Sequence, residues 1–458
     1  MNSLDLAGAE VLVIGGGVTG ISVADVLQTL GSRIFIVDEN NELAYDARRI
    51  TLEQALAGVW TFAVVSPGWR ADHPLVKQLK NNGTKLMSEV DLAWHLRCEL
   101  LPSQRWLAIT GTNGKTTTVE MAAAMLRAGG LNAVACGNVG DTVIEAVVSG
   151  EKFDYLILEL SSFQLQWSDM PEFAAAAILN ISEDHVDWHG SFEDYVQAKL
   201  RILTNSELAV LNADDSTVVE ATSHWRGRKV FFSLNVPKAG ELGLVENILV
   251  DRAFTLDPEE AGVISELKDV HPTAPHSVSN TLAAAALARS VGVAHESIQR
   301  AIKEFRPGRH RIETILEIDG VRWINDSKAT NPHAAKASIS SHLSVIWIAG
   351  GLAKGASMKD LVASCKNRIK AAILIGQDRE VIAKELENQS PGKLIVKVDP
   401  EKQPESSLME RVVMEAQKIA QPGDVVLLAP ACASMDQFVS YADRGDQFAG
   451  AVKKLVMK

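Results

Sequence analysis

Short apolar runs alternate with longer amphipathic stretches along this chain, and that alternation predicts an α/β protein. An apolar strand is expected at Val11–Ile14, and the helical stretch after it leads to a second strand that ends at Asp38. Further runs of strand length are FAVV, RWLAIT, YLILE, AAAILNI, LAVLN, KVFF, VRWIN, SVIWIA, AAILI and DVVLL. Because continuous apolar runs are typical of strands buried on both faces, we expect parallel sheets covered by helices.

The alternation is interrupted at two places, which divide the chain into three segments. A polar, proline-containing stretch at Glu99–Ser103 precedes a new strand, and Gly308 precedes another strand–helix series. We therefore expect three α/β domains, at residues 1–98, 99–307 and 308–458. The length of 458 residues also favours several domains over one.

The first segment carries a dinucleotide-binding fingerprint. Gly15, Gly17 and Gly20 follow the first strand with the spacing G-x-G-x-x-G, and Asp38 ends the second strand. Glycines at these positions let the backbone approach a pyrophosphate. NAD and UDP-sugars both contain a pyrophosphate, so the fingerprint leaves the ligand open. A glycine turn that only packs the helix onto the sheet is the alternative without a ligand.

The central segment contains a shortened phosphate loop. Gly114, Lys115 and Thr116 match the end of the pattern G-x-x-x-x-G-K-[ST], whereas Ile109 stands where the first glycine is expected. The loop lies between a strand and an amphipathic helix, so its amides point toward an anion at the helix N-terminus. Lysine supplies a positive charge and threonine a hydroxyl for Mg²⁺. We therefore predict that this segment binds a nucleoside triphosphate.

Several polar residues follow strands, at the sheet edge where open parallel sheets bind ligands. Glu159 offers the oxygen atoms that Mg²⁺ prefers, and His185 is a less usual Mg²⁺ ligand whose alternative role is structural. Lys199, taken alone, is typical of a lysine on the exposed face of a helix. Further candidates, for which a structural turn is the alternative, are Arg311, Asp326 and Lys328.

The composition narrows the function classes. The chain is 47% hydrophobic and 22% charged, as in ordinary globular proteins, and its net charge of −12 argues against a nucleic-acid-binding surface. The four cysteines are far apart, which favours neither a zinc ribbon nor a disulfide framework. No basic leader region and no apolar stretch of about 20 residues occurs. We therefore expect a cytoplasmic protein that binds neither membrane nor nucleic acid.

A set of motifs in the three segments resembles the Mur ligases of peptidoglycan synthesis. In chain order they are GTNGKTT, GNVG (137–140), ELSSFQL (159–165), NISEDHVDWHG (180–190), AKLRI (198–202), LNADD (211–215), HR (310–311) and NDSKATNP (325–332). The tail APACASMDQFVSYADRGDQF (429–448), with GGGVTG and VVSPG near the N-terminus, resembles the members that join D-glutamate to UDP-N-acetylmuramoyl-L-alanine. The resemblance implies a Rossmann-like N-terminal domain, a central P-loop ATPase-type domain and a Rossmann-like C-terminal domain.

The resemblance also implies the reaction and its partners. ATP would phosphorylate the carboxylate of the UDP-sugar, and the amine of D-glutamate would attack the acyl phosphate. ATP, UDP-N-acetylmuramoyl-L-alanine, D-glutamate and two Mg²⁺ ions are the implied ligands, and we expect a monomer. The alternatives are a ligase for another amino acid, a folylpolyglutamate synthase, an NAD-dependent oxidoreductase and a non-catalytic ATP-gated binding module.

The family's functional residues correspond to matching positions in this chain. The implied ATP contacts are Gly111, Thr112, Asn113, Gly114, Lys115, Thr116, Thr117, Asn280, Arg311 and Asp326. The implied metal ligands are Thr116, Glu159, His185 and a carbamylated Lys199, and the catalytic set is Lys115, Glu159, His185 and Lys199. The UDP-substrate contacts are Val18, Thr19, Asp38, Gly68, Asn138 and Ser161, and the D-glutamate contacts are Lys328, Thr330, Lys354, Ser434 and Tyr441. Departures from the family pattern occur at Ser277, in GGLAKG around Lys354, and at Tyr441.

Overall fold

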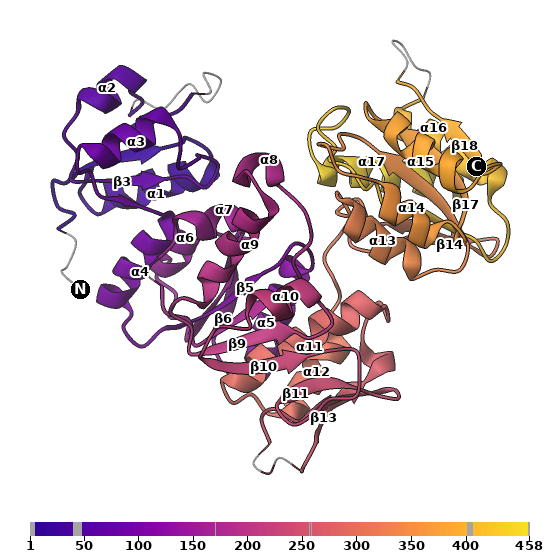
Figure 1. Ribbon diagram of the computed structural model, residues 1–458, viewed down its shortest axis with the longest axis horizontal. Coiled ribbons are helices and arrows are strands. Elements are labelled where there is room, and N and C mark those ends of the chain that lie inside the picture. Colours follow the sequence, from indigo (N-terminus) through magenta and orange to yellow (C-terminus); the bar gives the residue numbers. More distant parts are fainter. Residues whose placement is uncertain are drawn as a thin grey trace. The chain divides into compact units, whose positions relative to one another are not determined.

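The computed structural model describes residues 5–39, 48–169, 171–255, 257, 259–400 and 406–456. The chain forms two compact units, one made of Met1–Val270 and Val278–Phe305 and the other of His271–Ser277 and Arg306–Lys458. The described residues form three sheets, two in the first unit and one in the second, with helices on their faces (Figure 1). The expectation of a three-domain α/β protein is therefore confirmed.

The first unit begins with a four-stranded parallel sheet in the order β2-β1-β3-β4. Its strands are β1 (Glu10–Ile14), β2 (Arg33–Val37), β3 (Phe62–Val65) and β4 (Leu86–Met87), and its helices are α1 (Val18–Thr29), α2 (Leu52–Ala57), α3 (Pro74–Asn81) and α4 (Glu89–Leu100). A Cβ atom on Gly20 would lie 1.8 Å from the carbonyl oxygen of Gly15. Glycine is therefore required where α1 crosses the glycine loop, as the fingerprint predicts.

The second sheet of this unit has nine strands in the order β13-β12-β11-β10-β9-β8-β5-β7-β6. The strands are β5 (Arg105–Thr110), β6 (Ala133–Gly137), β7 (Tyr155–Glu159), β8 (Ala175–Ile178), β9 (Leu208–Asn212), β10 (Arg228–Phe232), β11 (Glu241–Val245), β12 (Ile248–Asp251) and β13 (Gly262–Glu266). The helices are α5 (Lys115–Ala128), α6 (Val143–Val148), α7 (Ser162–Trp167), α8 (Val186–His189), α9 (Phe192–Leu200), α10 (Ser216–Ala221), α11 (Pro275–Ser290) and α12 (His295–Glu304). Strand β5 lies between β7 and β8, third from the β6 end of the sheet, and the phosphate loop follows it.

One continuous apolar core joins the helices of the first sheet to the second sheet. It includes Val23 of α1, Trp94 of α4, Trp106 of β5 and Ile144 of α6, all of them buried. The rings of Trp94 and Trp106 meet edge to face with centroids 4.9 Å apart. Helix α4 extends to Leu100, so the interruption expected at Glu99–Ser103 begins inside a helix.

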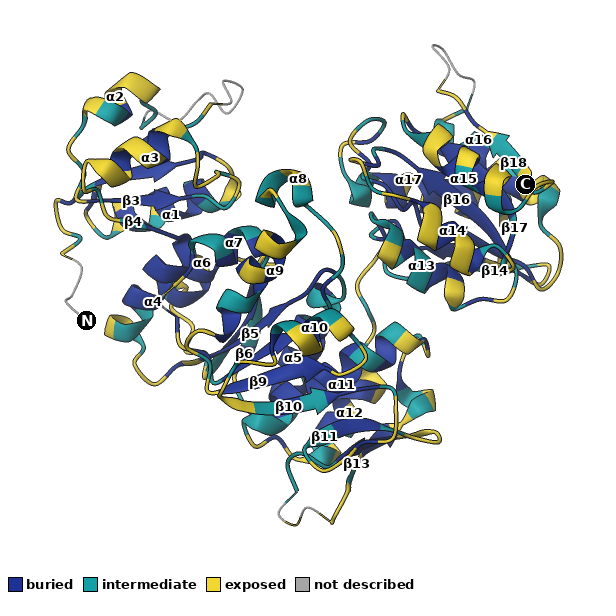
Figure 2. Ribbon diagram, viewed as in Figure 1, coloured by how far each residue is buried: buried dark blue, intermediate teal, exposed yellow. Residues whose placement is uncertain are grey.

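The second unit contains a six-stranded sheet in the order β14-β15-β19-β16-β17-β18. Its strands are β14 (Glu313–Ile318), β15 (Val321–Asn325), β16 (Val345–Gly350), β17 (Ile369–Ile375), β18 (Leu394–Lys397) and β19 (Val425–Leu428), and its helices are α13 (Pro332–Ser340), α14 (Lys359–Cys365), α15 (Arg379–Gln389), α16 (Leu408–Ile419) and α17 (Tyr441–Lys453). Apolar clusters lie on both faces of this sheet. Figure 2 shows the resulting layers, with buried strands between helices whose outer faces are exposed.

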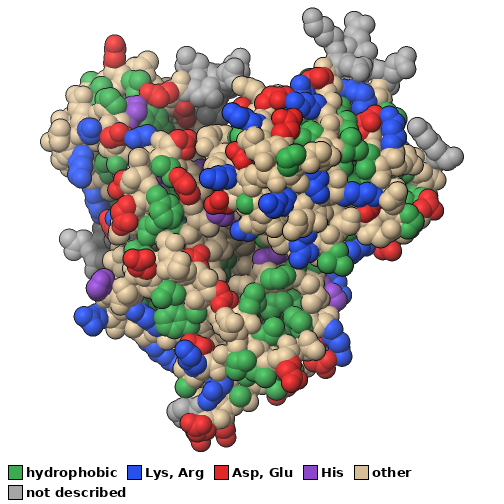
Figure 3. Space-filling view, turned by 45° about the vertical axis from the view of Figure 1, so that its right-hand side comes forward, with side chains coloured by type: hydrophobic (Ala, Val, Ile, Leu, Met, Phe, Trp, Pro, Cys, Tyr) green, Lys and Arg blue, Asp and Glu red, His purple; other side chains and the backbone are tan. Residues whose placement is uncertain are grey.

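The edges of the sheets differ from the sequence-based expectation. Strands β11, β12 and β13 add an antiparallel edge to the nine-stranded sheet, and β14 pairs antiparallel with β15. Strands β11 and β13 mix buried with exposed positions, and no position of β14 is fully buried, so these edge strands lack the continuous apolar runs that identified the central strands. None of the helices in the described ranges has the length and apolar character needed to cross a membrane. Acidic and basic side chains are interspersed on the face seen in Figure 3.

Asp251, at the end of β12, is fully buried and anchors this antiparallel edge. Its carboxylate accepts hydrogen bonds from Arg289 Nε (3.1 Å) and the Ala253 amide (2.8 Å), and it lies 2.9 Å from His295 Nε2. Burial alone would raise the pKa of Asp251, but the hydrogen bonds outweigh it and lower that pKa below its ordinary value.

We expect Asp251→Asn to lower the free energy of unfolding by about 3 kcal/mol near pH 7, because the change leaves the partly buried guanidinium of Arg289 without its counter-charge. A lowered pKa in the folded state means that this stabilisation is present above about pH 4 and is lost as the pH falls through the folded pKa. Urea unfolding of wild type and variant from pH 7 downward measures the difference. Glu266→Gln, which removes an exposed partner of Lys268, is the control and should change stability by less than about 0.5 kcal/mol.

Candidate functional site

The phosphate loop follows β5 and is fixed by hydrogen bonds from neighbouring loops. The Thr112 amide donates to the carbonyl oxygen of Asn180 (2.9 Å), and the Asn113 amide donates to Asn180 Oδ1 (2.8 Å). Gly114 has a φ of 85°, in the left-handed region that favours glycine. A Cβ atom there would lie 2.4 Å from Asn280 Oδ1, so the structure brings Asn280 of α11 against the loop.

Two lysines converge on one carbonyl oxygen of this loop. Lys115 Nζ donates to the carbonyl oxygens of Gly111 (2.9 Å) and Thr112 (3.2 Å). Lys199 Nζ, from α9, donates to the same Gly111 oxygen at 2.9 Å. The expectation that Lys199 lies on an exposed helix face is wrong, since its exposed fraction is 1%. The resemblance instead assigned Lys199 to the site, and the structure places it beside the phosphate loop.

The surroundings of Lys199 oppose a charged amine. Burial, followed by the charge of Lys115, lowers the pKa of Lys199 well below its ordinary value, while Asp184 acts in the opposite direction. The ring of Tyr195 lies 4.6 Å from Nζ, measured to its centroid. Tyr195 also hydrogen-bonds through its hydroxyl to Thr112 Oγ1 (2.9 Å), so α9 is attached to the phosphate loop at two points.

Glu159 ends β7, next to the phosphate loop in the sheet. Its Oε1 accepts a hydrogen bond from Asn138 Nδ2 (2.9 Å). Its Oε2 is buried and has no hydrogen-bond partner among the described residues, which is unusual for a carboxylate oxygen. Thr116 is the second residue of α5 and is buried. Ser161 is the N-cap of α7, and its hydroxyl donates to Gln164 Oε1 (2.9 Å).

His185 lies at the start of α8 in a left-handed conformation, with φ of 53°. Its side chain is partly exposed and lies 3.7 Å from an Asp184 carboxylate oxygen. The ring also contacts Phe163 edge to face, with centroids 4.8 Å apart. No group of three His, Cys, Asp or Glu residues suited to a metal ion occurs in the part of the chain that the structure describes.

The candidates of the N-terminal sheet surround the glycine loop. Val18, the first residue of α1, has an exposed fraction of 84%, and Thr19 follows it in the same turn. Asp38 Oδ2 accepts a hydrogen bond from the Gly16 amide (2.5 Å), which closes the loop onto the end of β2. The carbonyl oxygen of Gly68 accepts a hydrogen bond from Trp188 Nε1 of α8 (3.1 Å).

The remaining candidate residues lie in the second unit. Lys328 Nζ lies 3.9 Å from the centroid of the Tyr441 ring. Burial raises the pKa of Asp326 to about 6, and its Oδ1 accepts a hydrogen bond from the Ile312 amide, next to Arg311. Lys354 is exposed, in a left-handed conformation with φ of 50°. Thr330 follows Lys328 in the same loop, and Ser434 is buried after β19.

Comparisons with known proteins identify the family. A family model described as the Mur ligase middle domain matches residues 109–288, and one described as the Mur ligase glutamate ligase domain matches residues 310–432. A protein of Thermobifida fusca named UDP-N-acetylmuramoylalanine–D-glutamate ligase is 45% identical over 99% of this chain and 100% of its own length. The chain belongs to the Mur ligase family. A protein of the same name from Streptomyces avermitilis is 44% identical over 98% of each chain.

A solved structure supports the fold of this Mur ligase. MurF from Thermotoga maritima, in complex with ADP, has a TM-score of 0.59 and 16% identity and covers 99% of this chain and 97% of its own. A third family model, pyridine nucleotide-disulphide oxidoreductase, matches residues 10–55. That match spans β1, the glycine loop, α1, β2 and the first residues of α2, and a strand–glycine loop–helix–strand unit is shared by many nucleotide-binding folds.

Arg444 of this Mur ligase, one turn into α17, is not among the residues that the sequence predicted for the site. Arg444 is completely buried, and burial lowers its pKa to about 10. It donates to Ser327 Oγ (3.0 Å) and to the carbonyl oxygens of Ser327 (3.0 Å) and Cys432 (3.2 Å). The guanidinium therefore joins the loops that carry Lys328 and Ser434. In the sequence, Arg444 lies within the motif YADRGDQF. In the structure, it occupies a buried position of α17.

His189 and Asn180 were also missed, although both lie in the motif NISEDHVDWHG. Burial, followed by the charges of His185 and Lys199, lowers the pKa of His189 to about 4, and its Nε2 lies 2.9 Å from Ser162 Oγ. Two hydrogen bonds join the side-chain amide of Asn180 to the backbone of Asn113. Asn180 Oδ1 accepts from the Asn113 amide, and Asn180 Nδ2 donates to the Asn113 carbonyl oxygen (3.1 Å). Asn180 therefore positions the phosphate loop, whereas His189 contacts α7 and the ring of Tyr195, on the same helix as Lys199.

Proposed function

We propose that this protein is an ATP-dependent ligase that joins D-glutamate to UDP-N-acetylmuramoyl-L-alanine in the cytoplasmic synthesis of peptidoglycan precursors. The full-length relatives that bear the name UDP-N-acetylmuramoylalanine–D-glutamate ligase support this substrate pair. The observation that carries the reaction type is the contact of buried Lys199 with the Gly111 carbonyl oxygen, beside Lys115. A simple nucleotide-binding loop does not require a second, buried lysine at this point.

The roles that we propose for the central residues follow from their chemistry. The loop Gly111–Thr117 binds the ATP phosphates through its amides, Lys115 places its charge on the transferred phosphoryl group, and Asn280 borders the loop. In the second unit, Arg311 and Asp326 contact ATP. Val18, Thr19, Asp38, Gly68, Asn138 and Ser161 contact the UDP substrate.

The residues present fit Mg²⁺, which prefers hard oxygen ligands. Glu159 Oε2, buried without a hydrogen-bond partner among the described residues, is an oxygen that a cation satisfies, and the Thr116 hydroxyl lies on the phosphate loop. We assign Thr116 and Glu159 to one Mg²⁺, and His185 with a carbamylated Lys199 to the other. When bound, Mg²⁺ neutralises negative charge on the phosphates.

Carbamylation of Lys199 resolves a conflict in the local charges. A buried ammonium beside Lys115 is unfavourable, and a lowered pKa supplies the neutral amine that attacks CO₂. The amine nitrogen bonds to the carbon of CO₂ and releases one proton, which gives an anionic carbamate with two oxygen atoms. The carbamate nitrogen keeps one hydrogen, so the hydrogen bond to Gly111 can persist.

The reaction then follows from positioning. A carboxylate is a poor electrophile, so its oxygen attacks the γ-phosphorus of ATP, releases ADP and becomes an acyl phosphate. The neutral amine of D-glutamate attacks the acyl carbon, and the tetrahedral intermediate collapses to the amide with release of phosphate. Holding the reacting groups together supplies effective molarities of roughly 10⁵–10⁸ M. Lys328, Thr330, Lys354, Ser434 and Tyr441 are assigned to D-glutamate.

The substrate assignment predicts the outcome of a phosphate-release assay with ATP, Mg²⁺ and UDP-N-acetylmuramoyl-L-alanine. We expect turnover with D-glutamate and at most about 1% of that rate with L-glutamate, because inversion at the α-carbon moves the amine away from the acyl phosphate when both carboxylates are held. Equal turnover with L-lysine or meso-diaminopimelate would contradict the assignment. The match of residues 10–55 to an oxidoreductase family suggests hydride transfer with NAD instead. Replacing ATP with NAD and following the conversion of NAD to NADH tests that alternative.

Size-exclusion chromatography with light scattering tests our proposal of a monomer.

A further inference from the structure

The loop between β6 and α6 holds Glu159 from the side. Asn138, in this loop, donates its backbone N–H to the carbonyl oxygen of Glu159 (3.0 Å) and its side-chain N–H to Glu159 Oε1 (2.9 Å). A Cβ atom on Gly137 would lie 2.7 Å from the Glu159 carbonyl oxygen, so glycine is needed for this approach. The position of the loop therefore decides the position of the Glu159 carboxylate.

Two helices of the N-terminal sheet hold the far end of this loop. Ser22 Oγ of α1 lies 2.6 Å from Thr142 Oγ1, the N-cap of α6, in a buried contact. The Thr142 hydroxyl donates its one proton to Glu145 Oε2 (2.9 Å), so Ser22 is the donor to Thr142. Glu89, the first residue of α4, accepts a hydrogen bond from the Ile144 amide in the first turn of α6 (2.6 Å). We call Ser22, Glu89 and Thr142 the clasp.

Glu89 is a buried carboxyl group with no part in the proposed chemistry. Burial raises its pKa to about 7, and the charges of Glu145 and Asp91 act in the same direction, whereas the amides of Ile144 and Val143 lower it. A buried carboxyl group is costly unless it is hydrogen-bonded, and its partners here are the amides at the start of α6. The hydrogen bond between Glu89 and the Ile144 amide therefore fixes α6 to α4.

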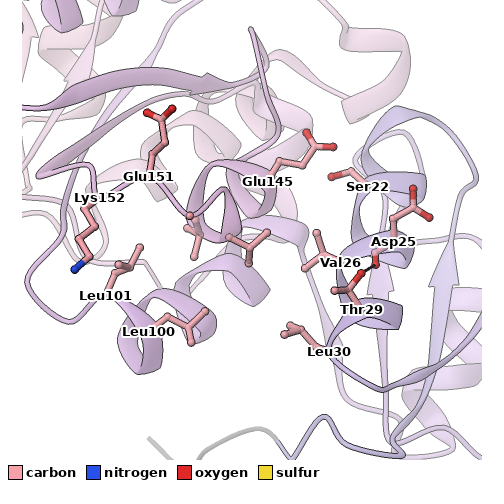
Figure 4. Close-up of a pocket in the computed structure, with 13 residues that line it drawn as sticks. Ser22, Asp25, Val26, Thr29, Leu30, Leu100, Leu101, Glu145, Glu151 and Lys152 are labelled. Carbon is pink, nitrogen blue, oxygen red and sulfur yellow. Dashed lines mark hydrogen bonds between the residues drawn. The ribbon is translucent and has the colours of Figure 1, made fainter.

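Helix α1 connects the clasp to the glycine loop. Its N-cap is Gly17, and Ser22 lies one turn after the first helical residue, Val18. Beyond the clasp, a pocket of about 580 Å³ opens between α1 and the elements opposite, α6 and the end of α4. Figure 4 shows Val26, Thr29 and Leu30 lining the pocket from α1, with Glu145 across from them. The Ser22–Thr142 contact therefore adds a buried hydrogen bond to the apolar core that α1 and α6 share through Val23 and Ile144.

We propose that the clasp couples the glycine loop of the N-terminal sheet to the phosphate loop. A nucleotide bound at the start of α1 fixes that helix, the clasp fixes the start of α6, and Asn138 then holds Glu159 where Mg²⁺ and ATP require it. Ser22, Glu89 and Thr142 are therefore positioning residues. The inference rests on the proposed function, because it takes the UDP substrate and ATP as the ligands of the two loops.

Calorimetry measures this coupling without turnover. ADP with Mg²⁺ is titrated into the full chain, with and without saturating UDP-N-acetylmuramoyl-L-alanine. In the wild type we expect the UDP-sugar to tighten ADP binding by about fivefold or more, and ADP to tighten UDP-sugar binding by the same factor. In Ser22→Ala, which loses the donor to Thr142, the factor should fall below about twofold. Thr29→Ala is the matched control with unchanged coupling, since that hydroxyl lines the same pocket but donates to Asp25 of its own helix (3.0 Å).

A second pair of variants separates positioning from general stability. Glu89→Gln keeps an oxygen that accepts from Ile144 and should retain the coupling, whereas Glu89→Ala should lose it. If Glu89→Ala does not fold, the coupling factor measured for Ser22→Ala alone tests the inference. Equal coupling in wild type and Ser22→Ala, or no coupling in the wild type, overturns the clasp inference and leaves the proposed function standing. Failure of the wild type to bind either ligand overturns the proposed function, and the inference with it.

Discussion

Lys199→Ala is expected to lose ligase activity by about 10³-fold while the protein stays folded, and acetate or formate is expected to restore part of it. The size of the loss follows from removing a preorganised charged group next to the transferred phosphoryl group. Partial rescue follows because a small carboxylate can occupy the space left by the side chain and return two oxygen atoms. Phosphate release at increasing acetate concentration measures both effects.

The control for this prediction is Lys80→Ala. Lys80 lies in the last turn of α3 and is exposed, so it matches the description that the sequence alone gave for Lys199. A change there should leave activity within about twofold and stability within about 0.5 kcal/mol. Labelling with ¹³C-bicarbonate gives a readout independent of turnover, since a carbamate signal is expected in the wild type and not in Lys199→Ala. Full activity of Lys199→Ala would refute the carbamate hypothesis.

The second large effect is expected for Glu159→Gln. The substitution keeps the shape of the side chain and the oxygen that accepts from Asn138, but removes the negative charge and replaces Oε2 by an amide nitrogen. We expect about a 10²-fold loss of ligase activity, and a loss of the stabilisation that Mg²⁺ adds to ADP binding. Without ligands the variant should be at least as stable as the wild type, because the change removes a buried charge whose Oε2 has no hydrogen-bond partner in the described structure.

Thermal unfolding with and without ADP and Mg²⁺ measures the effect of Glu159→Gln separately from turnover. Glu193→Gln is the matched control, since Glu193 is exposed in the first turn of α9, where its carboxylate accepts a hydrogen bond from Gln197 (2.7 Å). That variant should keep the Mg²⁺ effect. An unchanged Mg²⁺ effect in Glu159→Gln would exclude Glu159 as a metal ligand.

Local sequence patterns predicted the central strands and the phosphate loop, because the residues that form each of them are adjacent along the chain. A strand, a glycine-containing loop and a helix N-terminus follow one another at Arg105–Ala128, so the anion-binding geometry is built by neighbours in sequence. The edge strands β11–β13 were missed for the opposite reason. Their positions carry no long continuous apolar run. Only β11 pairs with β10, and β12 and β13 are strands because they pair in turn with β11 and with each other.

The position of Lys199 shows what the spacing of residues along a helix can predict and what it cannot. Tyr195 and Lys199 are four residues apart in α9 and lie on one face, together with buried Val196 and Ala198. That spacing indicates that Lys199 faces inward, in contrast to the exposed position expected from its residue type alone. The partner of Lys199, the Gly111 carbonyl oxygen, is 88 positions away along the chain. No local pattern indicates such a contact.

The α/β class, the two glycine loops and, through ordered motifs, membership of the Mur ligase family could all be predicted from the amino-acid sequence. Three features came from the folded structure alone. Lys115 and Lys199 share one carbonyl oxygen, Glu159 has a buried oxygen with no hydrogen-bond partner among the described residues, and Ser22 contacts Thr142, 120 positions away along the chain. The physical reason is the range of the interactions. Helices, strands and glycine turns follow from neighbouring residues, whereas burial, charge and hydrogen-bond satisfaction depend on side chains that folding brings together from distant segments.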